Sequence, residues 1–235
     1  FKGTVDFDPS DGVYELISNG SSDIFFAKYD TDGNLVLIKN VGGSGQDMGN
    51  GIYVDTNGTI LTTGNFHDTI DFQSGICEYN LTSNGNYDIF LAKYDSGGNQ
   101  SDFAGTGVAT CAGGGGAPSS ALTTTLRYVH DVAVGSDGNV YLAEPGCFKI
   151  RKVDVTTGII STVAGDGNSG NTGDGGLATA ARLNEPRGIA LDQSDNVFIS
   201  VAGGEKLRKI DATTGNIATF AGTGAPGNAG DGGDA

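Results

Sequence analysis

Two internal repeats constrain the fold of this chain more than any other feature of its sequence. The N-terminal part repeats without gaps at an offset of 65 residues: residues 4–7 (TVDF) recur as 69–72 (TIDF), and 23–30 (DIFFAKYD) recur as 88–95 (DIFLAKYD). The C-terminal part repeats at 57 residues: 149–154 (KIRKVD) recur as 206–211 (KLRKID). Periods of this size are typical of repeat architectures, in which each unit buries its apolar face against a neighbour.

Each repeat unit divides into short runs rich in Val, Ile, Phe and Tyr, separated by Asp-Gly, Asn-Gly and related turn signals. This pattern predicts four antiparallel strands per unit, and no segment shows a convincing helical period. In the last unit the predicted strands are 188–192, 196–200, 206–211 and 216–221, and in the unit before it 131–135, 139–143, 148–154 and 159–165. In the second unit they are 51–55, 59–64, 88–95 and roughly 108–113, and in the first 23–30 and 34–41 after a remnant near 4–7. We therefore predict an all-β fold, a β-propeller built of four-stranded antiparallel blades.

The strand pattern gives three whole blades and one partial blade. A propeller closed from these strands would leave one blade without its innermost strand and would expose unpaired edges, which such folds normally avoid. We therefore expect the chain to be a fragment of a larger propeller. The change of repeat predicts two regions in one continuous propeller arc, with one partial and one mostly complete blade in 1–104 and further blades in 105–235.

The motifs of both regions resemble known propeller repeats. Residues 105–235 resemble NHL repeats through 187–192 (RGIALD), 196–200 (NVFIS) and the loop 230–233 (GDGG). Residues 1–100 resemble the bacterial SBBP-type propeller repeat through 23–30 and 51–55 (GIYVD). Both resemblances imply propellers of the kind found in large secreted or surface proteins of bacteria, and neither implies one activity.

The charge of the chain narrows the choice of partners. Its formal net charge is -15 and its pI is about 4.2, which disfavours nucleic-acid backbones and anionic membranes as ligands. The basic residues repeated in 149–152 and 206–209 could form a stripe for RNA, but in so acidic a chain we expect them to neutralise nearby carboxylates. No apolar run is long enough for a transmembrane helix. We expect a protein or cell-surface partner and the remaining propeller blades, from a longer chain or another chain, without nucleic acid or membrane insertion.

The sequence shows no assembled catalytic group. His67 and His130 are the two histidines, and neither has a Cys or Glu at metal-ligand spacing. No Ser or Cys is accompanied by a recognisable base. We therefore predict a non-catalytic extracellular or cell-surface scaffold for interaction or adhesion, with any leader outside these residues. The alternative is a propeller enzyme, a lyase or hydrolase, whose catalytic or metal residues lie mostly outside this chain.

One short loop resembles a calcium site. Asp30, Asp32 and Asn34 place oxygen ligands at alternate positions, as at the start of an EF-hand loop. The chain then continues into a predicted strand instead of supplying the Glu of the full motif, and ordinary turn residues explain the pattern equally. We carry these residues forward as calcium candidates and predict no other cofactor.

Two glycine-rich loops and the cysteines give further candidates. Asp166, Asp174 and Asp231 could form an acidic rim for a cation or a basic partner, although turn chemistry also explains these loops. Cys77 and Cys147 both lie between the second and third strands of neighbouring blades, so we predict a disulfide between them. Cys111 lies at an apolar strand position and is expected to be a buried thiol.

Overall fold

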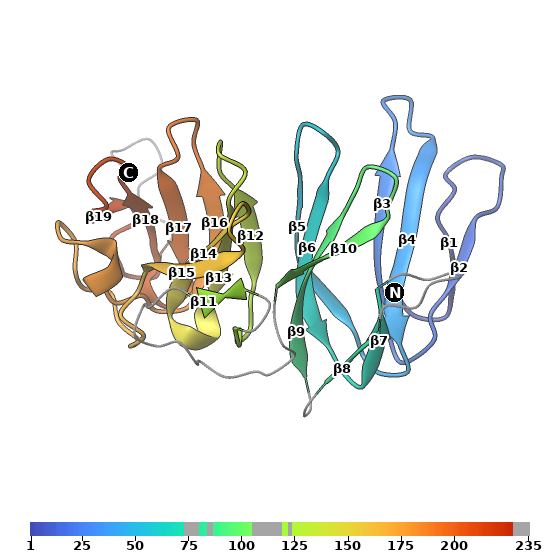
Figure 1. The fold of residues 1–235 in the computed structure, drawn as a ribbon, viewed down its shortest axis with the longest axis horizontal. Coiled ribbons are helices and arrows are strands. Elements are labelled where there is room, and N and C mark those ends of the chain that lie inside the picture. Colours follow the sequence, from blue (N-terminus) through green and yellow to red (C-terminus); the bar gives the residue numbers. More distant parts are fainter. Residues whose placement is uncertain (73–79, 84–86, 105–118, 122–123, 228–235) are drawn as a thin grey trace. The chain divides into compact units, whose positions relative to one another are not determined.

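The computed structural model describes residues 1–72, 80–83, 87–104, 119–121 and 124–227. It divides into two compact units, Phe1–Ala109 and Thr110–Ala235 (Figure 1). The described residues form β-strands joined by turns and three short 3-10 helices, η2 (Pro145–Cys147), η3 (Ala178–Ala180) and η4 (Ala202–Gly204). None of the helices in these residues is long and apolar enough to span a membrane.

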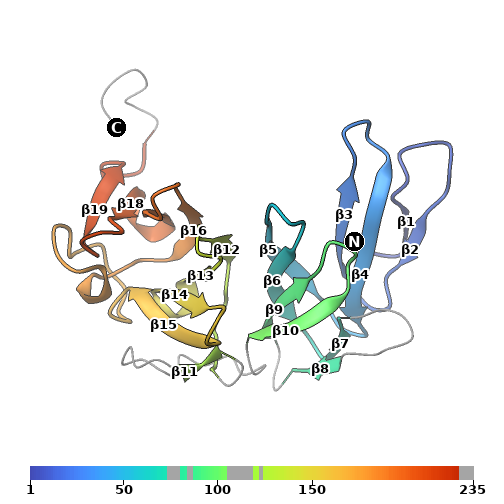
Figure 2. The ribbon, with the colours of Figure 1, turned by 45° about the horizontal axis from the view of Figure 1, so that its top comes forward.

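The described residues of unit 1 form ten strands in three antiparallel sheets. The strands are β1 (Thr4–Asp6), β2 (Glu15–Ile17), β3 (Ile24–Tyr29), β4 (Leu35–Gly43), β5 (Met48–Val54), β6 (Ile60–Phe66), β7 (Thr69–Asp71), β8 (Asn80–Thr82), β9 (Asp88–Tyr94) and β10 (Gln100–Ala104). β1 and β2 form a separate hairpin, and the two four-stranded sheets have the orders β3-β4-β7-β8 and β10-β9-β6-β5. Figure 2 shows the β1–β2 hairpin at one edge of this unit.

Two further antiparallel sheets lie in the part of unit 2 that the structure describes. The strands are β11 (Ser119–Ser120), β12 (Asp131–Val134), β13 (Val140–Glu144), β14 (Lys149–Asp154), β15 (Ile159–Ala164), β16 (Pro186–Leu191), β17 (Val197–Val201), β18 (Lys206–Ile210) and β19 (Ile217–Ala221). β12 to β15 follow one another in the sheet, with β11 added beside β15, and β16 to β19 form the second sheet in chain order. This up-and-down order is that of a propeller blade.

The predicted fold class is confirmed, because the described chain is all-β and is built of four-stranded antiparallel sheets compatible with a partial propeller. The first sheet, however, is completed in a way that the sequence did not predict. In the sequence β7 and β8 fall between β6 and β9, which are the second and third strands of the next sheet. β7 nevertheless pairs with β4 of the first sheet. In that next sheet the fourth strand is β10, whereas the predicted strand at 108–113 lies outside the described residues.

Apolar side chains from neighbouring sheets form the core of each unit. In unit 1 Ile24 and Phe26 of β3 share one cluster with Phe90 and Tyr94 of β9, and the rings of Phe26 and Tyr94 lie 4.8 Å apart. In unit 2 the cluster joins residues of β13 to β15 with residues of β16 to β19. Alternating strand residues thus face the adjacent sheet, as in a stack of blades.

Candidate interaction surfaces

Aspartates organise the tight turns of the sheets. In the turn between β3 and β4, Asp30 Oδ1 accepts hydrogen bonds from the backbone N–H groups of Asp32 and Asn34 at 2.9 and 2.8 Å. The Asn34 Nδ2 group donates to Asp30 Oδ2 at 2.9 Å. This side-chain bond, with the backbone bonds, lowers the pKa of Asp30. Asp95 with Asn99, and Asp192 with Asn196, repeat the same arrangement.

This geometry bears on the calcium candidates Asp30, Asp32 and Asn34. The Asp30 carboxylate is engaged by the turn, and Asn34 presents its amide nitrogen, not its oxygen, to that carboxylate. The described residues contain no group of three or more His, Cys, Asp or Glu side chains that could hold a metal ion. The turn interpretation accounts for these contacts, and the three residues stay untested calcium candidates.

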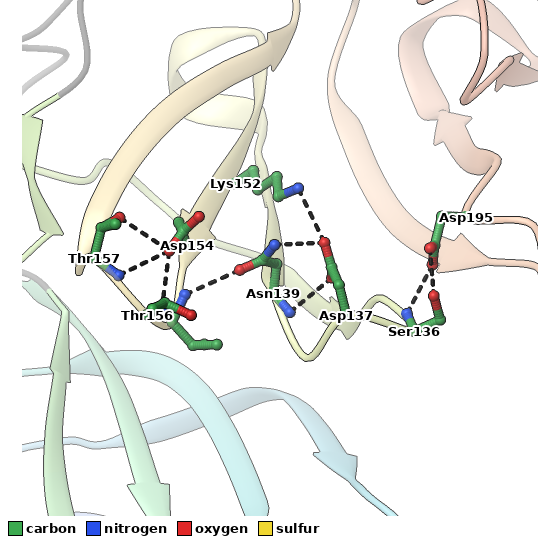
Figure 3. Close-up of polar contacts among 9 residues, drawn as sticks. Ser136, Asp137, Asn139, Lys152, Asp154, Thr156, Thr157 and Asp195 are labelled. Atoms are coloured by element: carbon green, nitrogen blue, oxygen red, sulfur yellow. Dashed lines mark hydrogen bonds and ion pairs between the residues drawn. The ribbon is translucent and has the colours of Figure 1, made fainter.

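A connected set of polar contacts lies at the turn end of unit 2 (Figure 3). The Asp195 carboxylate accepts hydrogen bonds from the backbone N–H and the hydroxyl of Ser136, at 2.7 and 2.5 Å. These bonds link the β12–β13 turn to the β16–β17 turn. Asp137 Oδ1 accepts a hydrogen bond from the backbone N–H of Asn139, and Asp137 Oδ2 lies 3.3 Å from Lys152 Nζ. Burial acts to raise the pKa of Asp137, but the bonds from Asn139 and the Lys152 charge outweigh it and leave this pKa lowered. Asp195 therefore holds two neighbouring turns together, whereas Asp137 fixes its own turn and ties it to β14.

The aspartates of the predicted acidic rim contact arginines. Asp166 lies 3.3 Å from Arg182 Nε. Asp174 Oδ1 binds the guanidinium of Arg208, which is 1% exposed, and its Oδ2 accepts the Thr219 hydroxyl at 2.6 Å. Burial opposes ionisation of Asp174, but the Thr219 and Arg208 bonds prevail and lower its pKa. Asp166 and Asp174 thus support the loop interpretation, whereas Asp231 lies outside the described residues and the rim as a whole stays a prediction.

Among the repeated basic residues Lys149, Arg151 and Arg208 are buried in the sheets, whereas Lys152, Lys206 and Lys209 are half-buried. Arg151 and Lys149 are 2% and 3% exposed. Arg151 Nη1 lies 3.6 Å from Glu144 Oε2, and Glu144 Oε1 accepts the Arg127 N–H at 2.7 Å. Burial raises the pKa of Glu144 to about 7. The sequence predicted neutralisation of nearby carboxylates at these positions, but it did not identify Glu144 as the partner.

The histidines and cysteines occupy separate places. His67 Nδ1 lies 3.1 Å from Asp68 Oδ2, and the His130 ring lies 6.3 Å from the Tyr128 ring. Cys147 is in a disulfide and is 3% exposed. Cys77 and Cys111 both lie outside the described residues, so the pairing of Cys77 with Cys147 and the buried thiol at Cys111 stay predictions.

An open cavity of about 320 Å³ lies in unit 2, where the turn after β13 meets the start of β16. Its lining residues are Arg127, Tyr128, Pro145, Gly146, Phe148, Glu185 and Arg187. Three of them have left-handed backbone without being glycine: Tyr128 at φ 55°, Phe148 at φ 56° and Glu185 at φ 53°. Such strain is uncommon for non-glycine residues and concentrates at functional sites.

The sequence did not indicate this cavity, although the repeat contains a partial signal for it. Tyr128 and Glu185 are equivalent at the 57-residue offset, and so are Phe148 and Glu205, which has φ 48°. The strained conformation therefore belongs to the blade, whereas the side chains that it carries differ between copies. Arg187 Nη2 lies 3.0 Å from Glu185 Oε2 in an exposed pair, and Arg127 Nη1 donates to the Gly146 carbonyl at 3.4 Å. Tyr128 is 47% exposed.

The successive four-stranded antiparallel sheets define a protein built of β-propeller-type blades. More particularly, residues 166–226 match the teneurin NHL domain family. This match covers the β16–β19 sheet and the loop before it, so the NHL resemblance is shown for that blade, and the SBBP resemblance of the N-terminal part stays a prediction.

Known proteins resemble parts of the chain. The Arabidopsis thaliana protein named SUPPRESSOR OF QUENCHING 1, chloroplastic, is 31% identical over 90 residues, which are 38% of this chain and 8% of that protein. A Bacteroides thetaiotaomicron protein of unknown function has a TM-score of 0.47 at 16% identity, over 88% of this chain and 56% of its own. Virginiamycin B lyase from Staphylococcus aureus has a TM-score of 0.42 at 15% identity, over 93% and 69%. The chain spans a small part of the curated relative, and these likenesses assign no activity.

Proposed function

We propose that this chain is a non-catalytic extracellular scaffold that binds a protein partner through the cavity of unit 2. The observation that carries the proposal is the lining of this cavity, where Arg127, Arg187 and the half-exposed Tyr128 meet around strained backbone. Arginine and tyrosine are enriched among the few residues that supply most of the binding energy at protein interfaces. The two guanidinium groups outnumber the single carboxylate of the lining, Glu185, which pairs with Arg187, and this favours a partner segment that carries a carboxylate, because Arg binds carboxylates in a bidentate geometry.

The remaining charged groups support a scaffold rather than a catalyst. In the part of the chain that the structure describes, the ion pairs Arg208–Asp174 and Arg151–Glu144 join neighbouring strands and loops. The turn aspartates accept hydrogen bonds from their own turns. These contacts explain the charged residues through the stability of the blades.

The disulfide of Cys147 supports the extracellular part of the proposal. Disulfides persist in secreted and surface proteins and are rare in reducing compartments. Fractionation of the source cells tests this point, with free thiols alkylated in denaturant because Cys147 is buried in the folded chain. We expect the protein outside the cytoplasm with Cys147 resistant to alkylation, and a cytoplasmic protein with a reactive Cys147 thiol would contradict it.

Selection from a displayed peptide library tests the cavity. We expect the wild-type chain to enrich peptides that contain Asp or Glu, because these can bind Arg127 and Arg187. A hydrogen bond to a charged group contributes about 1.5–3 kcal/mol, so Arg127→Ala or Arg187→Ala should weaken binding by about tenfold or more. Arg182→Ala is the matched control, since Arg182 is an exposed arginine that pairs with Asp166 and does not line the cavity.

Two results would contradict the proposal. Selected peptides that bind the cavity variants and the wild type equally would place the binding surface elsewhere. Turnover of a substrate, traced to residues of this chain by loss in a point variant, would show that the chain is an enzyme.

A further inference from the structure

The 65-residue repeat of unit 1 is also a structural repeat. The β1–β2 hairpin pairs Thr4 with Ile17 and Asp6 with Glu15. The β7–β8 hairpin has the same register 65 residues later, from Thr69 paired with Thr82 to Asp71 paired with Asn80. In each copy the hairpin precedes the strand that carries the repeated aromatic residues, which is β3 in the first copy and β9 in the second.

The second hairpin is part of the preceding sheet. Asp71 pairs with Gly42 and Ile70 pairs with Gly43, so β7 lies along the outer strand β4 of the earlier copy. Glycine is required at this contact, because a Cβ atom on Gly43 would collide with the Thr69 carbonyl oxygen. The equivalent edge positions of β1 are Val5 and Asp6, and among the described residues no strand other than β2 pairs with β1.

An aromatic cluster accompanies each hairpin. In the second copy Phe72 lies 6.4 Å from Phe66 and 5.0 Å from Phe90, measured between ring centroids. The Tyr94 hydroxyl donates to the Phe72 carbonyl at 3.1 Å.

The first copy repeats this cluster with equivalent residues. Phe7 lies 5.6 Å from Phe1 and 4.5 Å from Phe25. The Tyr29 hydroxyl donates to the Phe7 carbonyl at 2.9 Å. The two copies therefore build the same surface.

The two clusters differ in what covers them. Phe90 and Tyr94 are 1% and 0% exposed, because Ile24 and Phe26 of the preceding copy pack in the same cluster. Their equivalents Phe25 and Tyr29 are each 43% exposed. Large apolar groups exposed together mark interaction surfaces.

We infer that the outer edge of β1, together with Phe1, Phe7, Phe25 and Tyr29, is a docking surface for one further blade of the same repeat type. That blade places a Gly-Gly segment, equivalent to Gly42 and Gly43, along the β1 edge. It also lays apolar side chains equivalent to Ile24 and Phe26 on Phe25 and Tyr29. The inference concerns assembly of the blades and does not depend on the cavity of unit 2.

The free edge of β3 is consistent with the same partner. β9 lies between β6 and β10, whereas β3 pairs with β4 and with no second strand among the described residues. A preceding copy of the repeat would supply the counterpart of β6 to this edge. One added repeat would thus cover the aromatic face and both unpaired edges.

A duplication of residues 1–65, fused in frame before Phe1, tests the inference in the full chain. The repeat has no gap, so the added Asn65 precedes Phe1 as the native Asn65 precedes Phe66. The chain contains no tryptophan, so Phe25→Trp in the original copy is a unique fluorescent reporter. We expect the duplication to shift the reporter's emission to the blue, to cause a several-fold loss of acrylamide quenching, and to slow amide hydrogen exchange in β1.

The control duplication carries Gly43→Val in the added copy, where the new side chain would collide with the original Thr4 carbonyl, the counterpart of Thr69. In this control the exchange of β1 should remain fast. A duplicated chain that melts cooperatively but leaves the reporter exposed and β1 unprotected would overturn the inference. So would concentration-dependent burial of the reporter in the unextended chain, since a second copy would then be the occupant. Failure of the duplicated chain to fold, when the unextended chain folds, would also count against it.

Discussion

Truncation of the equivalent phenylalanines Phe25 and Phe90 should have unequal effects on stability. The two residues occupy the same position of the repeat in β3 and β9, and both contact a second phenylalanine, at 4.5 Å and 5.0 Å respectively. Their burial differs, because Phe90 is 1% exposed and Phe25 is 43% exposed. The repeat position and the contact with a second phenylalanine are thus matched between the sites, and the comparison measures what the covering strands add at Phe90.

The expected magnitudes follow from this burial. Phe→Ala at a fully buried site lowers the free energy of unfolding by about 3–5 kcal/mol, through lost transfer energy and the cavity that remains. Phe25 has about half of that burial and no sealed cavity would form, so Phe25→Ala should lower it by about 1–2 kcal/mol. The predicted difference between the variants is therefore about 2–3 kcal/mol.

Denaturant titration measures this difference. Far-ultraviolet circular dichroism follows the loss of the sheets. The transition of unit 1 gives the free energy of unfolding, provided that the substitution leaves the dependence of this free energy on denaturant concentration unchanged. Tyr94→Phe and Tyr29→Phe are a second matched pair, since both hydroxyls donate to a backbone carbonyl of the repeat. Equal costs for Phe25→Ala and Phe90→Ala would refute the reasoning, because they would mean that Phe25 is as deeply packed as Phe90.

Three further outcomes follow from the polar contacts. Burial raises the pKa of Asp47 to about 6, although hydrogen bonds from backbone N–H groups act to lower it. The folded state therefore holds this proton more tightly than the unfolded state does, and stability should fall as pH rises from about 4 to about 6. Asp47→Asn should flatten this slope, by at most about 3 kcal/mol over the interval, and an unchanged slope would contradict the assignment. Arg208→Ala should lower the free energy of unfolding by about 3–5 kcal/mol, because Arg208 is buried and ion-paired. Arg187 is exposed, so Arg187→Ala should change this free energy by less than about 1 kcal/mol. Equal effects of the two substitutions in thermal denaturation would refute this prediction. Millimolar calcium should leave the melting temperature unchanged because the turn occupies the Asp30 carboxylate, and a rise that is abolished by Asp30→Ala would establish the calcium site.

The sequence predicted strands β12 to β19 well because their turns are encoded locally, whereas it did not predict β11. Asp192 and Asn196, for example, close the β16–β17 turn with their own side chains, and the observed strands begin and end within two residues of the predicted ones. The pairing of β7 with β4 was not predicted, since it joins residues about 30 positions apart through backbone groups, and Gly42 and Gly43 do not specify which strand they approach.

The candidate site was less predictable than the fold. Tyr128 and Glu185 have left-handed backbone in positions where sequence rules favour glycine. Glu144 belongs to an apolar strand pattern, and its pairing with Arg151 depends on the arrangement of the strands in the sheet. The calcium and acidic-rim candidates were chosen because they are aspartates. In the described part of the chain, Asp30 accepts hydrogen bonds within a turn, and Asp166 and Asp174 form ion pairs with arginines.

A hydrogen-exchange footprint of the chain with a selected acidic peptide tests the central claim most directly, because it locates the bound peptide without assuming the site. The account predicts slower exchange at the segments that line the cavity, 127–128, 145–148 and 185–187, with the peptide recovered intact. Protection confined to the turn end around Asp137 and Asp195, or cleavage of the peptide, would contradict the claim that this chain binds its partner through the arginine–tyrosine cavity without catalysis.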